Sequence, residues 1–133
     1  MSRLTSGKFL LDTNIVIGLF GNDAIVKAHL MNADEVFISS TVLGELYFGA
    51  QKSSNVKKNI ERIEEFASSS AVLSCDADTA RYYGSVKNRL MEKGQPIPEN
   101  DIWIAAVAQQ HGLIVVSRDD HFREVENLKC ERW

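Results

Sequence analysis

The sequence predicts an α/β fold in three layers, with helices on both faces of a mostly parallel sheet. The first observation is the apolar run Leu113–Val116, which has no polar alternation and is therefore typical of a strand covered on both faces. The second is the helical pattern before it, which begins at Asp101 and ends at Gly112, a residue suited to a left-handed helix end. The third is that short apolar runs alternate with helical segments along the chain, which indicates repeated strand–helix units.

Each element is predicted from its own local pattern. Strands are expected at the short apolar runs Phe9–Leu11, Val36–Ile38, Val72–Leu73 and Leu113–Val116, with an edge strand at Leu128–Cys130. Helices are expected where apolar residues recur at helical spacing after a capping side chain. The first two are Ile15–Phe20 and a segment from Asn22 or Asp23 to about Met31. The others are a helix carrying Glu45 after Ser39, Ser40 and Thr41, an amphipathic helix over Ser54–Ala67, and a helix capped by Asp78 that ends at Gly94.

Length and composition narrow the class of protein. At 133 residues the chain is expected to form a single domain, residues 1–133, large enough to bury a core. With 44% hydrophobic and 25% charged residues, it is a globular rather than a disordered chain. A net charge of −3 disfavours a protein that binds nucleic acid over its whole surface, because such surfaces are strongly basic.

The cysteines and the hydropathy pattern bear on location. Cys75 and Cys130 have no CxxC spacing and lie in or beside apolar segments, so we expect buried thiols in a reducing compartment. The sequence has no charged-then-apolar leader and no long apolar run, so neither secretion nor a membrane span is expected. These features together predict a cytoplasmic protein.

Acidic residues follow the predicted strands. Asp12 follows the first strand, Glu45 lies one helical turn beyond the second, Asp119 lies just beyond Leu113–Val116, and Asp101 begins a helix. A parallel sheet brings such strand ends to one edge, where four carboxylates would repel one another and resist ionisation. A hard divalent cation removes that conflict, and oxygen ligands favour Mg²⁺ or Mn²⁺ over zinc. The three histidines, His29, His111 and His121, are too scattered in the sequence to indicate a zinc cluster.

Each acid also has a purely structural explanation. Asp101 is placed to complement a helix dipole or cap a helix, and Asp119 and Asp120 are common turn residues. Asp12 is placed to cap the next helix, although Asn14 is equally well placed. Glu45 interrupts an apolar segment without a capping role, which leaves a solvated face as its structural explanation.

A group of basic side chains has two explanations as well. Their spacing is typical of a solvated helix face, and RNA contact is the alternative. The group comprises Lys52, Lys57, Lys58 and Arg62.

With these residues in place, the chain resembles the PIN-domain ribonucleases, and most of all the small bacterial toxins of the VapC type. The matching stretches occur in family order and span most of the chain: Leu10–Asn14, Ser39–Glu45, Asn100–Ala106 and Ser117–Phe122. Any one of these motifs is weak evidence, and the ordered set is strong.

The resemblance implies both the fold and the site. It implies a five-stranded parallel sheet, with Asp12, Glu45, Asp101 and Asp119 as metal-binding acids and one or two Mg²⁺ or Mn²⁺ ions as cofactor. It suggests Thr13, Asn14 and Ser117 as supporting residues, and it assigns no RNA-binding side chains.

The resemblance also implies a function and partners. The expected reaction is metal-assisted hydrolysis of RNA phosphodiester bonds, in which the acids act as ligands rather than nucleophiles. The expected partners are an RNA substrate, a second copy of the chain in a homodimer, and an antitoxin encoded beside the toxin, with no membrane.

Three alternatives remain open at this point. A receiver domain would need an acidic pair after the first strand and a phosphate-accepting Asp after the third; Asp76 fits the second requirement, whereas only Asp12 meets the first. An aspartate-nucleophile phosphatase would need an acid where Asn14 stands. A catalytically silent binding module on the same fold is the third alternative.

Overall fold

The strands form one sheet in the order β3-β2-β1-β4-β5, and every neighbouring pair is parallel. This computed structural model describes residues 7–133. The strands are β1 (Lys8–Leu11), β2 (Glu35–Ser39), β3 (Ala71–Leu73), β4 (Ile114–Val116) and β5 (Cys130–Glu131). The helices are α1 (Thr13–Phe20), α2 (Ala24–Asn32), α3 (Ser40–Gln51), α4 (Val56–Ser68), α5 (Ala77–Lys93), α6 (Glu99–His111) and a short 3₁₀ helix, η1 (Asp120–Glu124). Residues 1–6, which include the start of the expected domain and the position of any leader, lie outside the described residues.

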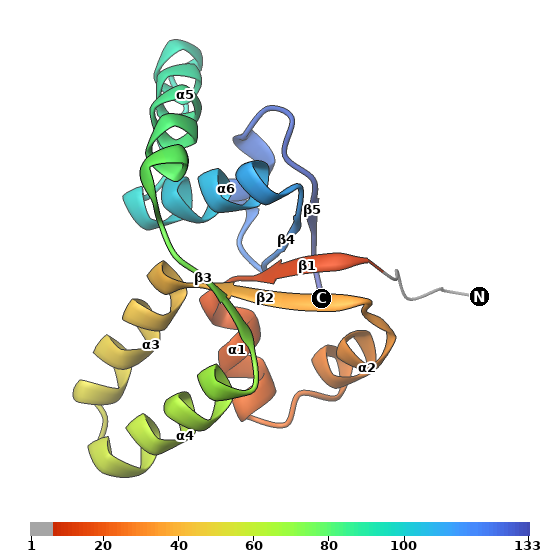
Figure 1. Cartoon of the computed structure of the whole chain (residues 1–133), viewed down its shortest axis with the longest axis vertical. Helices are drawn as coiled ribbons and strands as arrows, with labels where there is room; N and C mark the ends of the chain where they lie inside the picture. The colour runs from red at the N-terminus through yellow and green to blue at the C-terminus, as the bar shows by residue number, and fades with distance from the viewer. Residues whose placement is uncertain (1–6) are drawn as a thin grey trace.

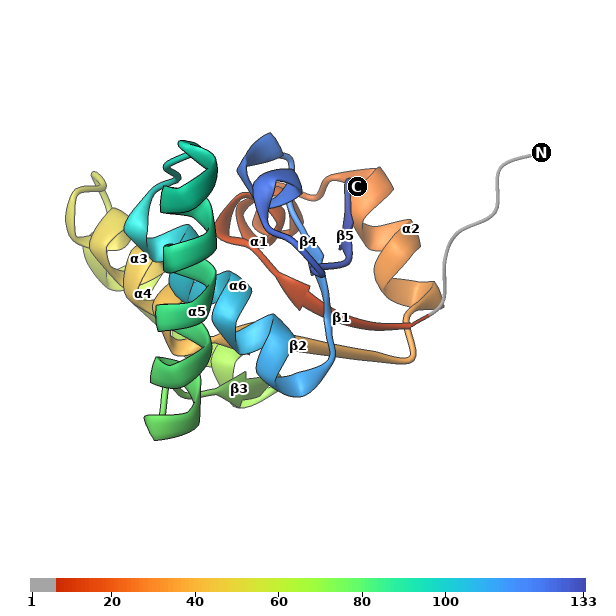
Figure 2. The same cartoon turned by 90° about the horizontal axis from the view of Figure 1, so that it is seen from above.

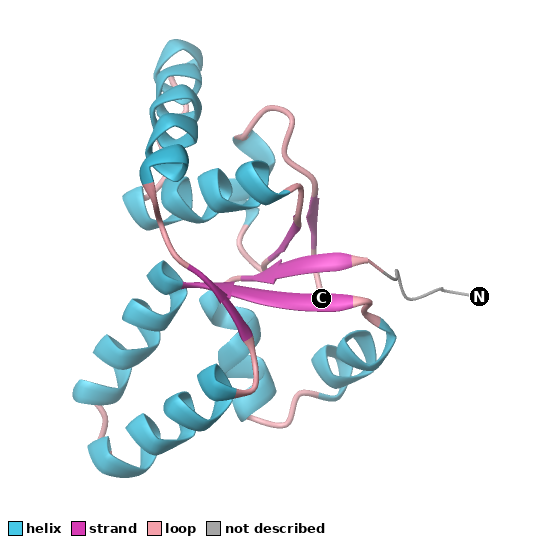
Figure 3. Cartoon of the chain, in the orientation of Figure 1, coloured by secondary structure: helices cyan, strands magenta, loops and turns pink. Residues whose placement is uncertain are grey.

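Helices cover the sheet on both sides, which confirms the predicted three-layer α/β class. Helices α1 to α4 lie below the strands in Figure 1, and α5 and α6 lie above them. Colouring by secondary structure shows the same sandwich (Figure 3), and the view from above shows α5 and α6 side by side in front of the sheet (Figure 2). The central strands are covered on both faces, because Phe9, Leu10, Leu11, Val115 and Val116 are all completely buried.

The order of the strands creates a ligand-binding position at the carboxyl edge of the sheet. From β1 the chain builds β2 and β3 on one side and then returns to place β4 on the other side of β1. In parallel sheets, ligands bind at the carboxyl ends of the strands where the order reverses in this way. Asp12 directly follows β1 and Ser117 directly follows β4. These two residues therefore lie at the reversal point.

The start of α5 differs from the sequence prediction, whereas α3 begins after one of the three capping residues expected for it. The N-cap of α5 is Asp76, not Asp78, and it forms a reciprocal capping box with Thr79. The side chain of Ser39 caps α3 by accepting a hydrogen bond from Val42 N. Capping side chains cluster before each of these helices, and only the backbone path selects one of them.

The predicted burial of the two cysteines is wrong, because Cys75 and Cys130 are both exposed. Cys130 lies in the edge strand β5, and Cys75 follows the other edge strand, β3. Edge strands lack a neighbour on one side, so an apolar context in the sequence does not guarantee coverage. Within residues 7–133, no helix is long and apolar enough to cross a membrane.

The predicted helix end at Gly112 is confirmed and allows a stability test. Gly112 has φ 66°, the left-handed conformation, with no atom near the position of an added Cβ. Gly112→Ala should therefore lower stability by about 1 kcal/mol through backbone strain alone. In a thermal melt this corresponds to a loss of about 4 °C.

Gly84 supplies the matched control for that substitution. It lies within α5, also with open space around an added Cβ, and its φ is not positive. Gly84→Ala should raise stability by up to about 1 kcal/mol, since alanine is the better helix former. Changes of the same sign in the two variants would contradict the conformational explanation.

Candidate active site

Asp12 is the buried centre of the candidate site. It ends β1 and caps α1, with only 6% of its surface exposed. Its Oδ1 accepts a hydrogen bond from Thr13 N at 2.8 Å, and its Oδ2 accepts one from Ser117 Oγ at 2.7 Å. The capping role anticipated for Asp12 is therefore real, and the same carboxylate also contacts the segment after β4. Asp12 thus joins the two sides of the strand reversal.

The predicted supporting residues form a hydrogen-bond network around Asp12. Ser117 Oγ also accepts from Asp119 N at 2.9 Å and lies 3.3 Å from Asn14 Nδ2, which donates to it. Asn14 Oδ1 accepts from the next backbone amide, that of Arg118, at 3.2 Å. The network fixes the turn after β4 relative to the start of α1.

Glu45 enters the site through Thr13. The hydroxyl of Thr13 donates to Glu45 Oε1 at 2.9 Å, which links α3 to the residue directly after Asp12. Glu45 is half-buried, and it lies beside an apolar groove. A fully solvated face therefore does not describe its position.

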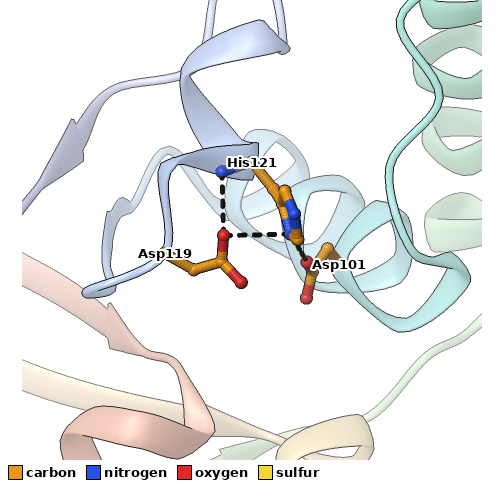
Figure 4. Close-up of side chains that lie close together, drawn as sticks. All are labelled: Asp101, Asp119 and His121. Carbon is orange, nitrogen blue, oxygen red and sulfur yellow. Dashed lines mark hydrogen bonds and ion pairs between the residues drawn. The ribbon is translucent and has the colours of Figure 1, made fainter.

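Asp101 and Asp119 converge on His121 (Figure 4). His121 Nδ1 lies 2.9 Å from Asp101 Oδ2 and 3.0 Å from Asp119 Oδ1. One potential ligand atom of each of these three residues lies within 4.8 Å of the other two. Among the described residues, no such compact trio includes Asp12 or Glu45. Asp12 joins the site through its hydrogen bond from Ser117 and through charge repulsion with Asp101 and Asp119. Glu45 joins it through the Thr13 hydroxyl.

The sequence does not single out His121, because its three histidines are too far apart in the chain to indicate a zinc site. Its one sequence signal was its position two residues after Asp119, inside a motif already assigned to the site. The turn bends back so that Asp119 Oδ1 also accepts from His121 N, at 3.1 Å. That bend brings the imidazole to Asp101, 20 residues away in sequence.

The structure shows which of these acids cap helices and which do not. Asp101 does not cap α6: the N-cap is Pro98, and Asp101 is a buried residue of the first turn. Asp119 does cap η1, whereas Asp120 is exposed and pairs with Arg123 and Arg132. Asp76 caps α5, and its Oδ1 accepts hydrogen bonds from Thr79 N and Gln110 Nε2.

The electrostatics of the site favour a bound cation. Burial raises the pKa of Asp12 and of Asp101 above the usual carboxyl range, against opposing hydrogen bonds from Ser117 and His121. The pKa of His121 is raised, first of all by its hydrogen bond to Asp101. Within residues 7–133, His121 is the only basic side chain within 4.0 Å of Asp12, Glu45, Asp101 or Asp119. The donor set, rich in carboxylate oxygen, fits a hard divalent cation.

Of the basic group at the end of α3 and on α4, Arg62 lines the same groove as Glu45. Lys52 lies over the ring of Phe48, and Arg62 lies over the ring of Phe20. Lys57 and Lys58 are exposed on α4. Nothing in these contacts decides between a solvated face and RNA contact.

Comparison with known proteins identifies the family. The PIN domain family matches residues 9–128. The chain is 40% identical to ribonuclease VapC2 of Haemophilus influenzae, over 95% of this chain and 98% of that protein. It is 36% identical, with the same coverage, to the tRNA(fMet)-specific endonuclease VapC of Shigella flexneri. The solved structure of VapBC2 from Rickettsia felis bound to a DNA fragment from their promoter is similar with a TM-score of 0.86 and 29% identity, covering 95% of this chain and 98% of that chain.

The fold is that of a PIN domain, and the family match over residues 9–128 confirms the predicted resemblance. Within that class the chain belongs to the VapC ribonucleases, the toxins of toxin–antitoxin pairs. The receiver, phosphatase and silent-module alternatives are thereby set aside.

Asp101→Asn tests whether the buried charge strains the metal-free fold. A folded-state pKa above the unfolded value means that ionising Asp101 costs stability, a cost absent at low pH that appears as pH rises through the folded pKa. In chelator near neutral pH, the variant should therefore melt at a higher temperature than the wild type. This advantage should shrink as pH falls toward the usual carboxyl range.

The control for that melt is Asp120→Asn, which removes an exposed charge from the neighbouring turn. It should give no such pH-dependent advantage. Adding Mn²⁺ should stabilise the wild type more than Asp101→Asn, because a ligand that binds only the native state shifts the unfolding equilibrium. Equal melting temperatures in chelator and equal gains with Mn²⁺ would refute a charge cluster at Asp101.

Proposed function

We propose that this VapC ribonuclease is a Mg²⁺- or Mn²⁺-dependent endoribonuclease acting on tRNA, with Asp12, Glu45, Asp101 and Asp119 as the metal-binding acids. The observation that supports the proposal is that Asp101 and Asp119 share His121 as a partner and lie near enough to Asp12 to repel its charge, while Thr13 links Glu45 to the residue after Asp12. Buried carboxylates that face one another with so little compensation are unfavourable unless a cation joins them.

Some side chains of the site would bind the cation, and others orient the carboxylates. Glu45 Oε2 and Asp101 Oδ1 accept no hydrogen bond from the described residues, so both oxygens remain available as ligand atoms. Ser117 and Thr13 each donate to a carboxylate oxygen of the site and so fix its direction. When bound, one or two such cations would stabilise charge on the phosphodiester and lower the pKa of a bound water.

Two other oriented groups contribute without being ligands. Asn14 fixes the turn after β4 by bonding to Ser117 and to the Arg118 amide. His121 lies between Asp101 and Asp119 with its side chain 44% exposed, so it can turn toward solvent when a cation takes its place. The fixed carboxylates and these donors give a preorganised site, which is the main source of rate in phosphoryl transfer.

The substrate class comes from the relatives. The VapC of Shigella flexneri is described as tRNA(fMet)-specific, and we propose a tRNA substrate for this chain on that similarity. A tRNA substrate also fits the proposed cytoplasmic location. We propose that residues 1–133 form a single nuclease domain.

RNA cleavage with and without metal tests the proposal. Purified chain should cut tRNA in Mg²⁺ or Mn²⁺ and lose this activity in chelator. Asp12→Asn and Glu45→Gln should each reduce the rate at least about 100-fold, because each removes a charged ligand and nearly keeps the shape. Ser117→Ala should cost about 10- to 100-fold, the usual effect of losing a group that orients a ligand.

The control for the cleavage assay is again Asp120→Asn, which should cut tRNA at the wild-type rate. Mapping the cut ends reports whether one tRNA is selected. Full activity of both Asp12→Asn and Glu45→Gln, with the fold intact by circular dichroism, would rule out the assigned site.

We further propose that the chain forms a homodimer and binds its antitoxin in the groove beside Glu45. This groove, of about 310 Å³, is lined largely by apolar side chains of α1, α3 and α4, including Ile17, Leu46 and Ile63. Ile17 is 57% exposed, which leaves apolar surface for a partner to cover. A peptide that fills the groove reaches Glu45, where a basic side chain would meet the acids.

Antitoxin binding should depend on Ile17. Ile17→Ser should weaken antitoxin binding about tenfold, by loss of apolar contact, and keep RNA cleavage. Ile25→Ser is the control, because Ile25 is equally exposed at 59% but lies on α2, outside the groove. Sedimentation of the chain with and without the neighbouring-encoded antitoxin measures both the dimer and the complex. Equal affinity for the two variants would exclude this groove.

A further inference from the structure

Arg118 stands between two residues of the site, Ser117 and Asp119, and does not point into it. Its side chain turns away toward α2 and the end of β5. Nη2 donates to Asp23 Oδ2 at 2.7 Å, and Nε donates to the backbone oxygen of Trp133 at 2.8 Å. Both contacts join segments remote in sequence, so the guanidinium acts as a cross-link behind the site.

The backbone of Arg118 is held as firmly as its side chain. Its amide donates to Asn14 Oδ1 at 3.2 Å, and its carbonyl oxygen accepts from Arg132 Nη1 at 2.5 Å. The guanidinium also packs against α1 at Gly18, where an added Cβ would lie 3.8 Å from Nη1. A residue fixed through its amide, carbonyl and side chain leaves little freedom to the residue that follows it.

The anchors that Arg118 contacts are themselves rigid. The Trp133 side chain is buried, with its ring stacked on His29 at 4.8 Å between centroids and edge-on to Phe9 at 5.1 Å. Asp23 caps α2 through hydrogen bonds from Ile25 N and Val26 N. The Arg118 hydrogen bond holds the pKa of the Asp23 carboxyl below its usual range, so this anchor is charged at neutral pH.

Asp119 has no comparable support of its own. Its side chain is 37% exposed, and the partner of its Oδ1 among the described residues is His121 alone, through the backbone amide at 3.1 Å and Nδ1 at 3.0 Å. Its backbone amide donates to Oγ of Ser117, the residue directly after β4. The direction of the Asp119 carboxylate therefore depends on the residue before it.

We propose that Arg118 is a positioning residue, cross-linked to Asp23 and Trp133 so that the turn after β4 presents Asp119 to the cation and the RNA. The inference rests on the proposed function, because it assigns Asp119 to a metal site. Arg118 does not touch the substrate in this arrangement, since its guanidinium is engaged behind the turn.

The change in Mn²⁺ affinity on replacing Arg118 distinguishes a positioning role from a purely electrostatic one, because the two roles predict changes in opposite directions. Removing a positive charge near an acidic site would, by electrostatics alone, raise its affinity for a cation. Loss of positioning predicts the opposite. We expect Arg118→Gln to lower Mn²⁺ affinity, measured by titration calorimetry, about 10- to 100-fold. We also expect kcat for tRNA cleavage to fall while KM changes less than about threefold.

Two further variants keep the test informative if Arg118→Gln folds poorly. Asp23→Asn should keep the α2 cap, because Asn caps about as well as Asp, and yet weaken Mn²⁺ binding through loss of the charged partner. Arg118→Lys should give an intermediate affinity, because a single ammonium cannot reproduce the fork that reaches both Asp23 and Trp133. Arg123→Gln is the control: this exposed arginine lies in the next turn and pairs only with Asp120, so affinity and rate should stay at wild-type values.

The outcomes separate this inference from the proposed function. If the wild type neither binds Mn²⁺ nor cleaves tRNA, the proposed function fails. If the wild type does both and Arg118→Gln matches or exceeds its Mn²⁺ affinity, the proposed function stands and the positioning role is overturned. A lower melting temperature in chelator with unchanged Mn²⁺ affinity likewise overturns it, since that result describes a residue that is only structural.

Discussion

The buried hydrogen bond between Ser117 and Asp12 is the contact on which the rest of the site depends. It closes the point where the strand order reverses, and it joins the end of β1 to the turn after β4. Both partners are 6% exposed, so neither has water as a substitute partner. Around this bond, Thr13 connects to Glu45, and Ser117 connects to Asp119. One contact between neighbouring parallel strands thus orders acids from distant segments.

Burying the carboxylates of the site lowers the stability of the metal-free fold. Burial raises the pKa of Asp12 and Asp101, which means that the metal-free fold holds their charges at a cost. A half-exposed histidine offsets part of that cost without blocking the site permanently. A cation bound among these acids, as in the proposed metal-dependent reaction, would remove that cost.

Support for the site comes from behind as well as from beside it. The turn after β4 is short and partly exposed, and loops of this kind are rarely rigid on their own. Here the aromatic packing of Trp133 on Phe9 and His29 supplies a fixed point, and Arg118 transmits it to the turn. Residues at the far end of the chain therefore contribute to the direction of one carboxylate.

The sequence by itself determined the class of fold and the parallel central strands, because apolar runs such as Leu113–Val116 and stop residues such as Gly112 act locally. It did not determine which of several capping residues begins a helix, as Asp76 and Ser39 show, or whether Cys130 is covered. Only the tertiary structure brought His121 to Asp101 and Arg118 to Trp133. The physical reason is that local patterns fix secondary structure, whereas contacts between remote side chains depend on how the turns at the sheet edge bend.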